Sequence, residues 1–214
     1  MPQIIQQFLS QLKDTSLLEY IAVFTGIASV WFSKKENIWV YPTGLINTII
    51  YIYLSFKYHL LGEASVNLYY TAMSIYGWML WAKKDSTQHH ILNITFSTKK
   101  QWLTQILFCV GFYVAIYFAL IYLKQSFATG AIPWADAFAS ATAYTGMWLM
   151  AKKKVESWWW WILTNTASIP LYFVKGLAFT SVYYVVLLAL AVFGLLEWMQ
   201  RAKQKQSTFE FENK

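Results

Sequence analysis

The chain carries the same series of features twice, about 117 residues apart. Each copy presents an acid, a Trp, a Lys cluster, an Asn, a Lys, a Gly and a Trp, in that order. A shift of 117 relates four pairs: Glu19 with Asp136, Trp31 with Trp148, Gly77 with Gly194, and Trp81 with Trp198. A shift of 118 relates Asn47 with Asn165, and Lys57 with Lys175. The change of shift implies that one residue is gained and later lost. Both copies are strongly apolar, and duplicated apolar units are typical of transporter folds, whose site lies between the copies near the bilayer midplane.

The spacing of the charged residues predicts membrane-spanning helices. The chain is 57% hydrophobic and 13% charged, whereas soluble domains are about 25% charged. Long uncharged stretches separate the charges, and about 20 helical residues cross a bilayer core. Helices are expected because backbone groups in lipid must be satisfied within their own segment. The seven predicted spans are at about residues 15–33, 38–57, 64–83, 101–124, 133–151, 157–175 and 179–199.

The Lys and Arg residues predict the orientation of the chain. The net charge is +7, but the basic residues fall in loops, which argues against a nucleic-acid partner. When the loops are assigned to alternate sides, four basic residues lie on the side of the N-terminus and 13 on the other. Basic residues stay cytoplasmic. We therefore expect the N-terminus outside and the C-terminus inside, which requires an odd number of spans.

The repeat and the number of spans together predict the architecture. Span one matches span five, so both copies cross the membrane in the same direction. The predicted fold class is an all-α integral membrane protein with seven transmembrane helices, arranged as 3+1+3 with two parallel three-helix repeats. Its segments are an N-terminal interfacial segment at 1–14, a first repeat at 15–84, a loop and linker helix at 85–132, a second repeat at 133–200 and a charged cytoplasmic tail at 201–214, which we expect to be frayed.

The sequence contains no pattern of an enzyme. HExxH, GxSxG and Walker motifs are absent, and the acids lie at span ends, in loops or in the tail. His89 and His90 are adjacent, so they point apart on a regular element and are interpreted as part of a solvated loop. Cys109 is the single cysteine and is interpreted as an inert buried thiol. We expect no catalytic residue, no bound metal and no cofactor.

Uncharged polar residues in mid-membrane are the candidate binding residues. Asn47 falls in span two, Asn67 in span three and Asn165 in span six. An amide in hydrocarbon needs a hydrogen-bond partner. This partner could be a group on a neighbouring helix or a ligand. The recurrence of Asn47 as Asn165 favours a ligand. Trp161 lies four residues before Asn165 and shares its face, which suits an aromatic ligand carrying a carboxamide. Of the four consecutive tryptophans at Trp158–Trp161, two or more are expected to face lipid or the membrane interface.

Several of these segments resemble the PnuC family of bacterial vitamin transporters, which carry nicotinamide riboside. The matching segments are GLIN at Gly44–Asn47, the stretch Asn67-Leu-Tyr-Tyr, IYGWxxW at Ile75–Trp81 and ESWWWWILTNTAS at Glu156–Ser168. The resemblance covers about residues 15–200 and implies a SWEET-like fold with the same 3+1+3 arrangement. Two departures matter: many relatives have Gln in place of Asn67, and Thr43 rather than a Trp lies four residues before Asn47. The two half-sites are therefore not expected to be equivalent.

The ligand that the resemblance implies suits these residues. Nicotinamide riboside has a cationic pyridinium ring, a carboxamide and a ribose. Trp161 is expected against the ring, and Asn165 and Asn67 against the carboxamide. The residues expected to reach the ribose hydroxyls are Asn47, Tyr69 and Tyr76. A phosphorylated product would find no Lys or Arg in mid-membrane, so the nucleotide should be excluded.

The mechanism expected is facilitated diffusion by alternating access. Coupled transporters commonly use intramembrane acids, and this chain has none near the midplane. The resemblance implies the bacterial cytoplasmic (inner) membrane and trapping of the substrate by a cytoplasmic nicotinamide riboside kinase. Pro170 removes a backbone donor and frees the carbonyl of Thr166, which predicts a hinge in span six; a static kink is the alternative.

Other functions remain open from the sequence. The same scaffold would suit another flat vitamin, such as riboflavin or thiamine. A non-transporting membrane receptor or assembly subunit is the alternative from a different class, and it would bind a ligand without flux. Exposed Trp and Tyr would face either lipid or a neighbouring protomer, so a homo-oligomer is also open.

Overall fold

The computed structural model describes residues 6, 9–10, 16–57, 61–84, 91–123 and 130–212. Within them lie seven helices of at least 18 residues, each matching one predicted span. They are α2 (Leu17–Lys34), α3 (Val40–Lys57), α4 (Leu61–Ala82), α5 (Lys99–Leu123), α6 (Pro133–Ala151), α7 (Ser157–Val174) and α8 (Ala178–Glu212). Most of the predicted interfacial segment at 1–14, and the pair His89 and His90, fall outside the described residues.

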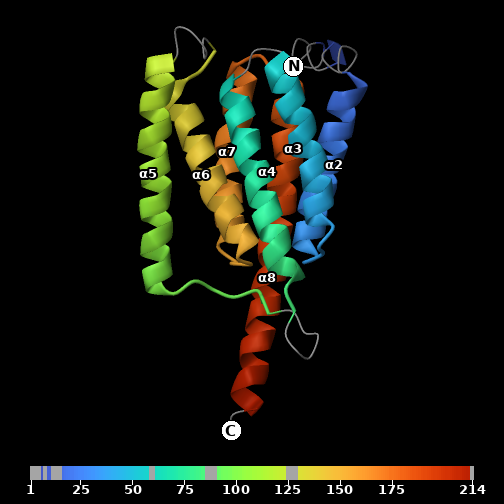
Figure 1. The fold of residues 1–214 in the computed structure, drawn as a ribbon, viewed down its shortest axis with the longest axis vertical. Coiled ribbons are helices and arrows are strands. Elements are labelled where there is room, and N and C mark those ends of the chain that lie inside the picture. The colour runs from blue at the N-terminus through green and yellow to red at the C-terminus, as the bar shows by residue number, and fades with distance from the viewer. Residues whose placement is uncertain are drawn as a thin grey trace.

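The last helix is longer than its predicted span. α8 continues without a break from Ala178 to Glu212 and projects well beyond the other helices (Figure 1). The expectation of a frayed tail after Arg201 is therefore wrong. Gln, Lys, Arg and Ala are good helix formers, and lengthening an existing helix avoids the cost of nucleating a new one.

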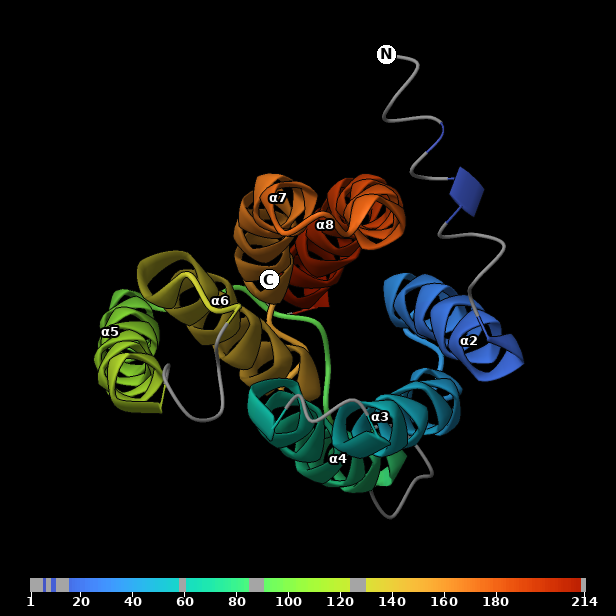
Figure 2. The same ribbon diagram turned by 90° about the horizontal axis from the view of Figure 1, so that it is seen from above.

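The helices pack as two groups of three with one additional helix. α2, α3 and α4 pack in sequence order, as do α6, α7 and α8, while α5 packs against α6. The groups meet where α2 contacts α8 and where α4 contacts α6 (Figure 2). α2 and α6 run in the same direction (Figure 1), so the predicted 3+1+3 arrangement of parallel repeats is confirmed, with α5 as the linker.

The repeats match at one constant offset. Ser33 contacts Met150 and Glu36 contacts Lys153, and the members of each pair are 117 residues apart. A residue that meets its own counterpart lies near the approximate twofold axis between the repeats. α3 and α7 also begin and end at positions that share this offset, so no residue is gained between them.

The offset corrects the pairing of the two mid-membrane asparagines. At 117, Asn47 corresponds to Thr164, and Asn165 corresponds to Thr48. The predicted match of Asn47 with Asn165 is therefore wrong by one residue. One residue turns a side chain by about 100° around a helix, so the two amides point in different directions relative to their own repeats.

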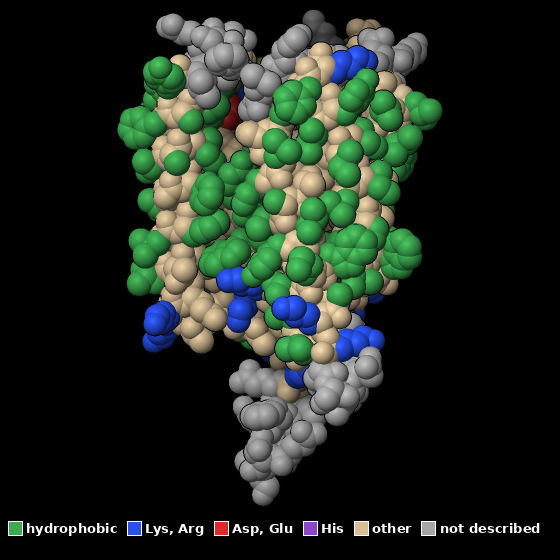
Figure 3. Space-filling model, in the orientation of Figure 1, with side chains coloured by type: hydrophobic (Ala, Val, Ile, Leu, Met, Phe, Trp, Pro, Cys, Tyr) green, Lys and Arg blue, Asp and Glu red, His purple; other side chains and the backbone are tan. Residues whose placement is uncertain are grey.

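The outer surface is that of a membrane protein. By length and composition α2, α5 and α8 are apolar enough to cross a bilayer, with mean hydropathies of 1.2, 2.0 and 2.2. Hydrophobic side chains cover the sides of the bundle, while Lys and Arg gather mainly at the end from which α8 projects (Figure 3). We call this the basic end. It holds Lys34, Lys35, Lys83, Lys84, Lys99, Lys100, Lys152, Lys153 and Lys154.

The core at the basic end contains two matched tryptophans. Trp81 on α4 donates from Nε1 to the carbonyl of Ala151 at 3.2 Å, and Trp198 on α8 donates to the carbonyl of Lys34 at 3.1 Å. Both donors and both acceptors correspond at the offset of 117. Each bond crosses from one repeat to the other and satisfies a carbonyl that the end of a helix leaves free.

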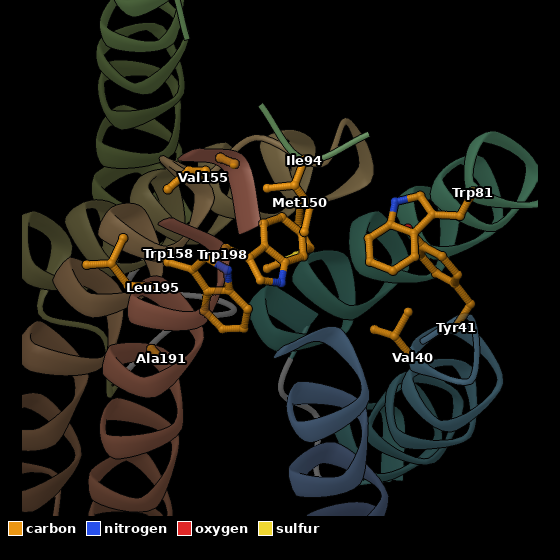
Figure 4. Packing of buried hydrophobic residues seen from close by; sticks show 11 residues of the cluster. Val40, Tyr41, Trp81, Ile94, Met150, Val155, Trp158, Ala191, Leu195 and Trp198 are labelled. Carbon is orange, nitrogen blue, oxygen red and sulfur yellow. The ribbon is translucent and has the colours of Figure 1, made fainter. Parts of the chain in front are cut away.

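The partners of these tryptophans correspond as well. Tyr41 meets the Trp81 ring edge to face at 5.2 Å, and Trp158 meets the Trp198 ring in the same way at 5.5 Å (Figure 4). Gly77 and Gly194 make room for these rings, because an added Cβ would lie 2.5 Å from Tyr41 or Trp158. The two repeats are thus nearly identical in packing at this end.

Candidate functional site

An aromatic cluster lies where α4 of the first repeat meets α6 and α7 of the second. Tyr69 stacks on Tyr144 at 4.2 Å, and its hydroxyl donates to the backbone carbonyl of Tyr144 at 3.0 Å. Tyr70 contacts the rings of Tyr144 and Trp161 at 6.3 and 6.1 Å. Phe112 on α5 meets Tyr144 edge to face at 5.1 Å. Tyr69 and Trp161, both predicted site residues, therefore lie in one cluster although they come from different repeats.

The Trp161 ring lies against the backbone of α6. A Cβ added to Gly146 would lie 3.2 Å from the indole, so glycine lets the ring pack flat. At the offset of 117 the first repeat has Gly44 in place of Trp161 and Ser29 in place of Gly146. The large ring is thus present in one repeat only, and the residue in its place is Gly44 rather than the expected Thr43.

Asn165 is the most enclosed of the predicted polar residues. It lies one turn from Trp161 on α7, and only 3% of its surface is exposed. Its neighbour Thr164 donates to the carbonyl of Trp160 and lies 2.9 Å from the hydroxyl of Thr142. Asn165 itself makes no hydrogen bond through its side chain to any residue that the structure describes. A buried amide without a partner costs free energy, so this group is available to a ligand.

Asn47 differs from Asn165 in its bonding. Its Nδ2 donates to the backbone carbonyl of Ala22 on α2 at 2.6 Å, which is a bond between helices of the kind expected of polar residues in membranes. The amide oxygen then points away from this carbonyl. Within the described part of the chain, this Oδ1 accepts no hydrogen bond.

The two remaining predicted residues lie on α4. Asn67 is half-buried, and its backbone carbonyl accepts from Thr71 at 2.9 Å. Tyr76 is 42% exposed and lies two turns beyond Tyr69 toward the basic end. Tyr76 therefore lies outside the aromatic cluster.

The four consecutive tryptophans are more buried than expected. Trp158 and Trp160 are buried and Trp161 is half-buried, so Trp159 alone is exposed, at 49%. The expectation that two or more face lipid or the interface is wrong. α6 and α8 pack on either side of α7, and Gln105 of α5 accepts from the Trp160 indole at 3.1 Å. The Trp158 and Trp160 rings are thereby covered by neighbouring helices or bonded to them.

A buried polar chain fixes the linker to the second repeat. Glu156 accepts from the backbone and the hydroxyl of Ser97 at 2.8 and 2.7 Å, and Gln105 joins Ser97 to the Trp160 indole. Thr95 also pairs with the backbone of Lys153. α5 and the loop before it are therefore attached to the same repeat as Trp161.

A charged cluster lies where the repeats meet at the basic end. Lys153 is buried, donates to Glu36 at 2.7 Å and lies 4.6 Å from the Trp81 ring centroid. Arg201 contacts both Glu36 and Glu197, at 3.3 and 2.7 Å. Because the Glu36–Lys153 pair joins equivalent positions of the two repeats, it lies near the axis about which they are related.

Both residues of this ion pair have a left-handed backbone. The φ of Glu36 is 57° and that of Lys153 is 51°, in a region that favours glycine. The corresponding position after α7 is Gly176, with a φ of 78°. Strained non-glycine residues persist where the surroundings require them, and here their side chains pair with each other.

The candidate hinge residue lies inside a continuous helix. Pro170 falls within α7 on its exposed side. The hydroxyl of Ser181 on α8 donates to the carbonyl of the preceding Ile169 at 2.8 Å. Pro42, by comparison, lies in the first turn of α3, where proline is tolerated.

Comparison with known proteins agrees with this arrangement. Residues 16–200 match the model of a family described as nicotinamide mononucleotide transporter. Similar proteins include the nicotinamide riboside transporter PnuC of Escherichia coli (strain K12), 24% identical over 91% of this chain and 90% of that protein. The fold is similar to the crystal structure of the vitamin B3 transporter PnuC, with a TM-score of 0.71 and 26% identity over 94% of this chain and 88% of the other.

The chain belongs to the PnuC family of membrane transporters. The predicted resemblance is therefore confirmed. Similar proteins also include the riboflavin/roseoflavin transporter RibM of Streptomyces davaonensis, 24% identical over 84% of this chain and 83% of that protein. Proteins similar to this chain are thus named for more than one substrate.

Several aromatic residues near the candidate site were not predicted from the sequence. Tyr70 and Tyr144 lie in the aromatic cluster, and Tyr183 and Tyr184 of α8 lie close to Tyr70. One residue in five is aromatic, so residue type alone could not identify them.

Proposed function

We propose that the chain carries nicotinamide riboside across the membrane by facilitated diffusion. The observation that carries this proposal is the buried Asn165 amide, which has no partner among the described residues and lies beside the Trp161 ring. The names of two similar proteins support the same substrate. Trp161 binds the cationic pyridinium ring, where a desolvated cation–π contact contributes about 2 kcal/mol. Asn165, with Asn67, pairs with the carboxamide.

The ribose extends toward the first repeat in this proposal. Asn47 presents a free amide oxygen there, and Tyr69 keeps an acceptor on the hydroxyl that donates to Tyr144. Tyr76 contributes less than was expected from the sequence, since it lies outside the aromatic cluster and is 42% exposed.

The nucleoside rather than the nucleotide is the proposed substrate, although the matched family is described by the mononucleotide. A phosphate dianion in a low-dielectric interior requires cationic partners. The described Lys and Arg side chains lie at helix ends, in loops or on the part of α8 that projects at the basic end. An excess of nicotinamide mononucleotide should therefore fail to compete with the riboside. Competition at comparable concentrations would contradict this part of the proposal.

Riboflavin is the second candidate substrate. The similarity to RibM supports it, and a flavin would also stack on Trp161. A panel of nicotinamide riboside, riboflavin and thiamine in one competition assay separates these ligands. A receptor or assembly subunit would bind one of them without flux.

Alternating access is proposed to work through the charged cluster at the basic end. The Glu36–Lys153 pair and the two Trp–carbonyl bonds join the repeats there, so opening toward this side requires them to separate. The second repeat moves together with α5, because the Glu156–Ser97–Gln105 chain fixes them to each other. Net uptake then depends on phosphorylation of the riboside by a cytoplasmic kinase.

The proposed location is the bacterial inner membrane with the basic end in the cytoplasm. The gathering of Lys and Arg at one end supports this orientation (Figure 3). A reporter that is active only in the cytoplasm should be active when fused after Lys214 and inactive at the N-terminus. The opposite pattern would reject the orientation.

The experiment that tests the substrate site uses purified protein in proteoliposomes. Trp161→Ala should weaken binding of nicotinamide riboside roughly 30-fold, the equivalent of about 2 kcal/mol, and reduce flux at low substrate concentration. Trp159→Ala is the matched control, because this ring is the exposed one of the four. Equal losses in both variants, at equal expression, would favour a packing role for Trp161.

A further inference from the structure

A glycine on α2 allows two polar groups from different repeats to come together. A Cβ added to Gly26 would collide with the hydroxyl of Tyr183 on α8 and lie 2.8 Å from Nδ2 of Asn47 on α3. Alanine cannot be accommodated here unless one of these groups moves. The Tyr183 hydroxyl and the Asn47 amide therefore lie side by side, at the interface where α2 contacts α8.

These two groups offer complementary hydrogen-bonding capacity. Nδ2 of Asn47 donates one of its two N–H groups to the carbonyl of Ala22, and the second N–H is left as a donor on the nitrogen that lies beside Gly26 and the Tyr183 hydroxyl. The Tyr183 hydroxyl makes no hydrogen bond to the residues that the structure describes. One free N–H and one free hydroxyl thus lie beside each other, and neither is needed to hold the helices together.

This place is connected to the ring site. Tyr183 lies close to Tyr51 and Tyr184, and Tyr184 and Tyr183 both lie close to Tyr70. Tyr70 in turn contacts the Trp161 ring at 6.1 Å. Neighbouring tyrosines thus lead from the Trp161 ring through Tyr70 to Tyr183, which lies beside Asn47.

We propose that Tyr183 and Asn47 together bind a sugar hydroxyl of the transported substrate, with Gly26 providing the close approach. This proposal rests on the proposed function and adds a specificity residue to it. A sugar hydroxyl can accept from the second N–H of Asn47 and donate to the Tyr183 oxygen, because a hydroxyl is both a donor and an acceptor. Because Tyr183 and Asn47 belong to different repeats, the bound hydroxyl bridges them.

The test compares two ligands that share a ring and differ in the sugar. Nicotinamide riboside carries the ribose, and 1-methylnicotinamide has the same cationic ring and carboxamide without it. Tyr183→Phe should weaken binding of the riboside by roughly three- to tenfold, the usual loss for one hydrogen bond, and leave binding of 1-methylnicotinamide unchanged. Tyr122→Phe is the control for loss of a tyrosine hydroxyl, because Tyr122 is 86% exposed on α5.

Deoxyribosides identify the bonded atom. One deoxyriboside lacks the hydroxyl that bonds to Tyr183. Wild type should bind this deoxyriboside as weakly as Tyr183→Phe binds the complete riboside. Tyr183→Phe should bind the deoxyriboside no more weakly than wild type does. Gly26→Ala should reproduce the pattern of Tyr183→Phe by displacing its hydroxyl. Unchanged riboside binding by Tyr183→Phe, or an equal loss for both ligands, would overturn the proposal.

Failure of the proposed function gives a different result. In that case wild type itself does not bind nicotinamide riboside, and the same comparison is made with riboflavin and lumichrome, which share a flavin-type ring and differ in the hydroxylated chain. A loss confined to riboflavin in Tyr183→Phe would support the hydroxyl site with another substrate. If wild type binds neither pair, both proposals are overturned.

Discussion

The two repeats agree closely at the basic end and differ in mid-membrane. At the basic end Trp81 corresponds to Trp198, and both make the same bond to the opposite repeat. In mid-membrane Gly44 stands in place of Trp161, and Thr48 in place of Asn165. The contacts that join the repeats have thus been kept equal, while the residues of the candidate site have diverged. Motion between repeats benefits from equal contacts, whereas an asymmetric ligand requires unequal half-sites.

The ion pair at the axis shows why two linked repeats differ from a symmetric dimer. In a dimer of identical chains, a residue on the twofold axis meets its own copy, and two like charges would repel. Here the equivalent positions hold Glu36 and Lys153. Duplication within one chain permits opposite charges on the two sides, and the left-handed backbone of both residues brings them to the axis.

The largest effect is expected from breaking this pair. Glu36→Gln leaves Lys153 buried without its partner, and removal of one partner of a buried ion pair costs about 3 kcal/mol. The midpoint of thermal unfolding should fall. The exchange variant with Glu36→Lys and Lys153→Glu restores opposite charges at equivalent positions and should recover part of the loss, because Arg201, which contacts Glu36, would then face the new lysine. No recovery would show that the two positions are not interchangeable.

The next largest effect tests whether the packing of the two repeats is equal. Gly77→Ala forces a methyl group into the Tyr41 ring and Gly194→Ala forces one into the Trp158 ring, and overpacking typically costs about 1–3 kcal/mol. Both variants should lose similar stability in chemical or thermal unfolding. Gly111→Ala, which meets nothing within 4 Å, is the control and should lose none. A large difference between the first two would break the equivalence of the repeats.

The fold could be predicted from the sequence, but the direction in which each helix turns its side chains could not. Span number and direction follow from hydrophobic length and basic loops, and these signals are averages over many residues. The match of Asn47 to Asn165 rested on a single shared residue type, and the constant offset in the structure replaces it with Thr48. Residue identity misled because the two repeats differ in sequence at the candidate site.

The buried polar groups near the linker were also beyond the sequence. In the sequence, Glu156 and Gln105 are polar residues near the ends of predicted spans, and nothing there predicts that they are buried. In the structure both are buried and are joined through Ser97. Their role depends on a loop that returns to the second repeat, and hydrophobic periodicity does not predict the path of a loop. Trp161, by contrast, was predicted as a site residue because it shares a helical face with Asn165, and the structure places its ring beside Tyr70.

A smaller effect on stability is expected at Asn47. Asn47→Leu removes the bond to the Ala22 carbonyl, and such bonds in membranes are worth about 0.6–2 kcal/mol. Unfolding should show a loss of this size. Thr164→Val, at the corresponding position of the second repeat, removes the hydroxyl that meets Thr142 and is the matched comparison. If Asn47→Leu is as stable as wild type, the interhelical bond is not formed.

The smallest effect on binding is expected from the hinge variant. Pro170→Ala restores a backbone donor and stiffens α7, and the residue lies on the exposed side of the helix. Binding of nicotinamide riboside at equilibrium should stay nearly unchanged, while flux in proteoliposomes slows. Unchanged flux would leave Pro170 as a residue that sets the shape of the helix.

The most direct test of the account is the thermal stability of Asn165→Leu with and without nicotinamide riboside. An amide kept for a ligand contributes nothing to the stability of the empty protein, so the variant without ligand should unfold at the temperature of wild type or higher. Saturating ligand raises the unfolding temperature of a protein that binds it, and this rise should be present in wild type and lost in the variant. A variant that is less stable when empty, yet is stabilised by the riboside as much as wild type, would show that Asn165 holds helices together and would contradict the account.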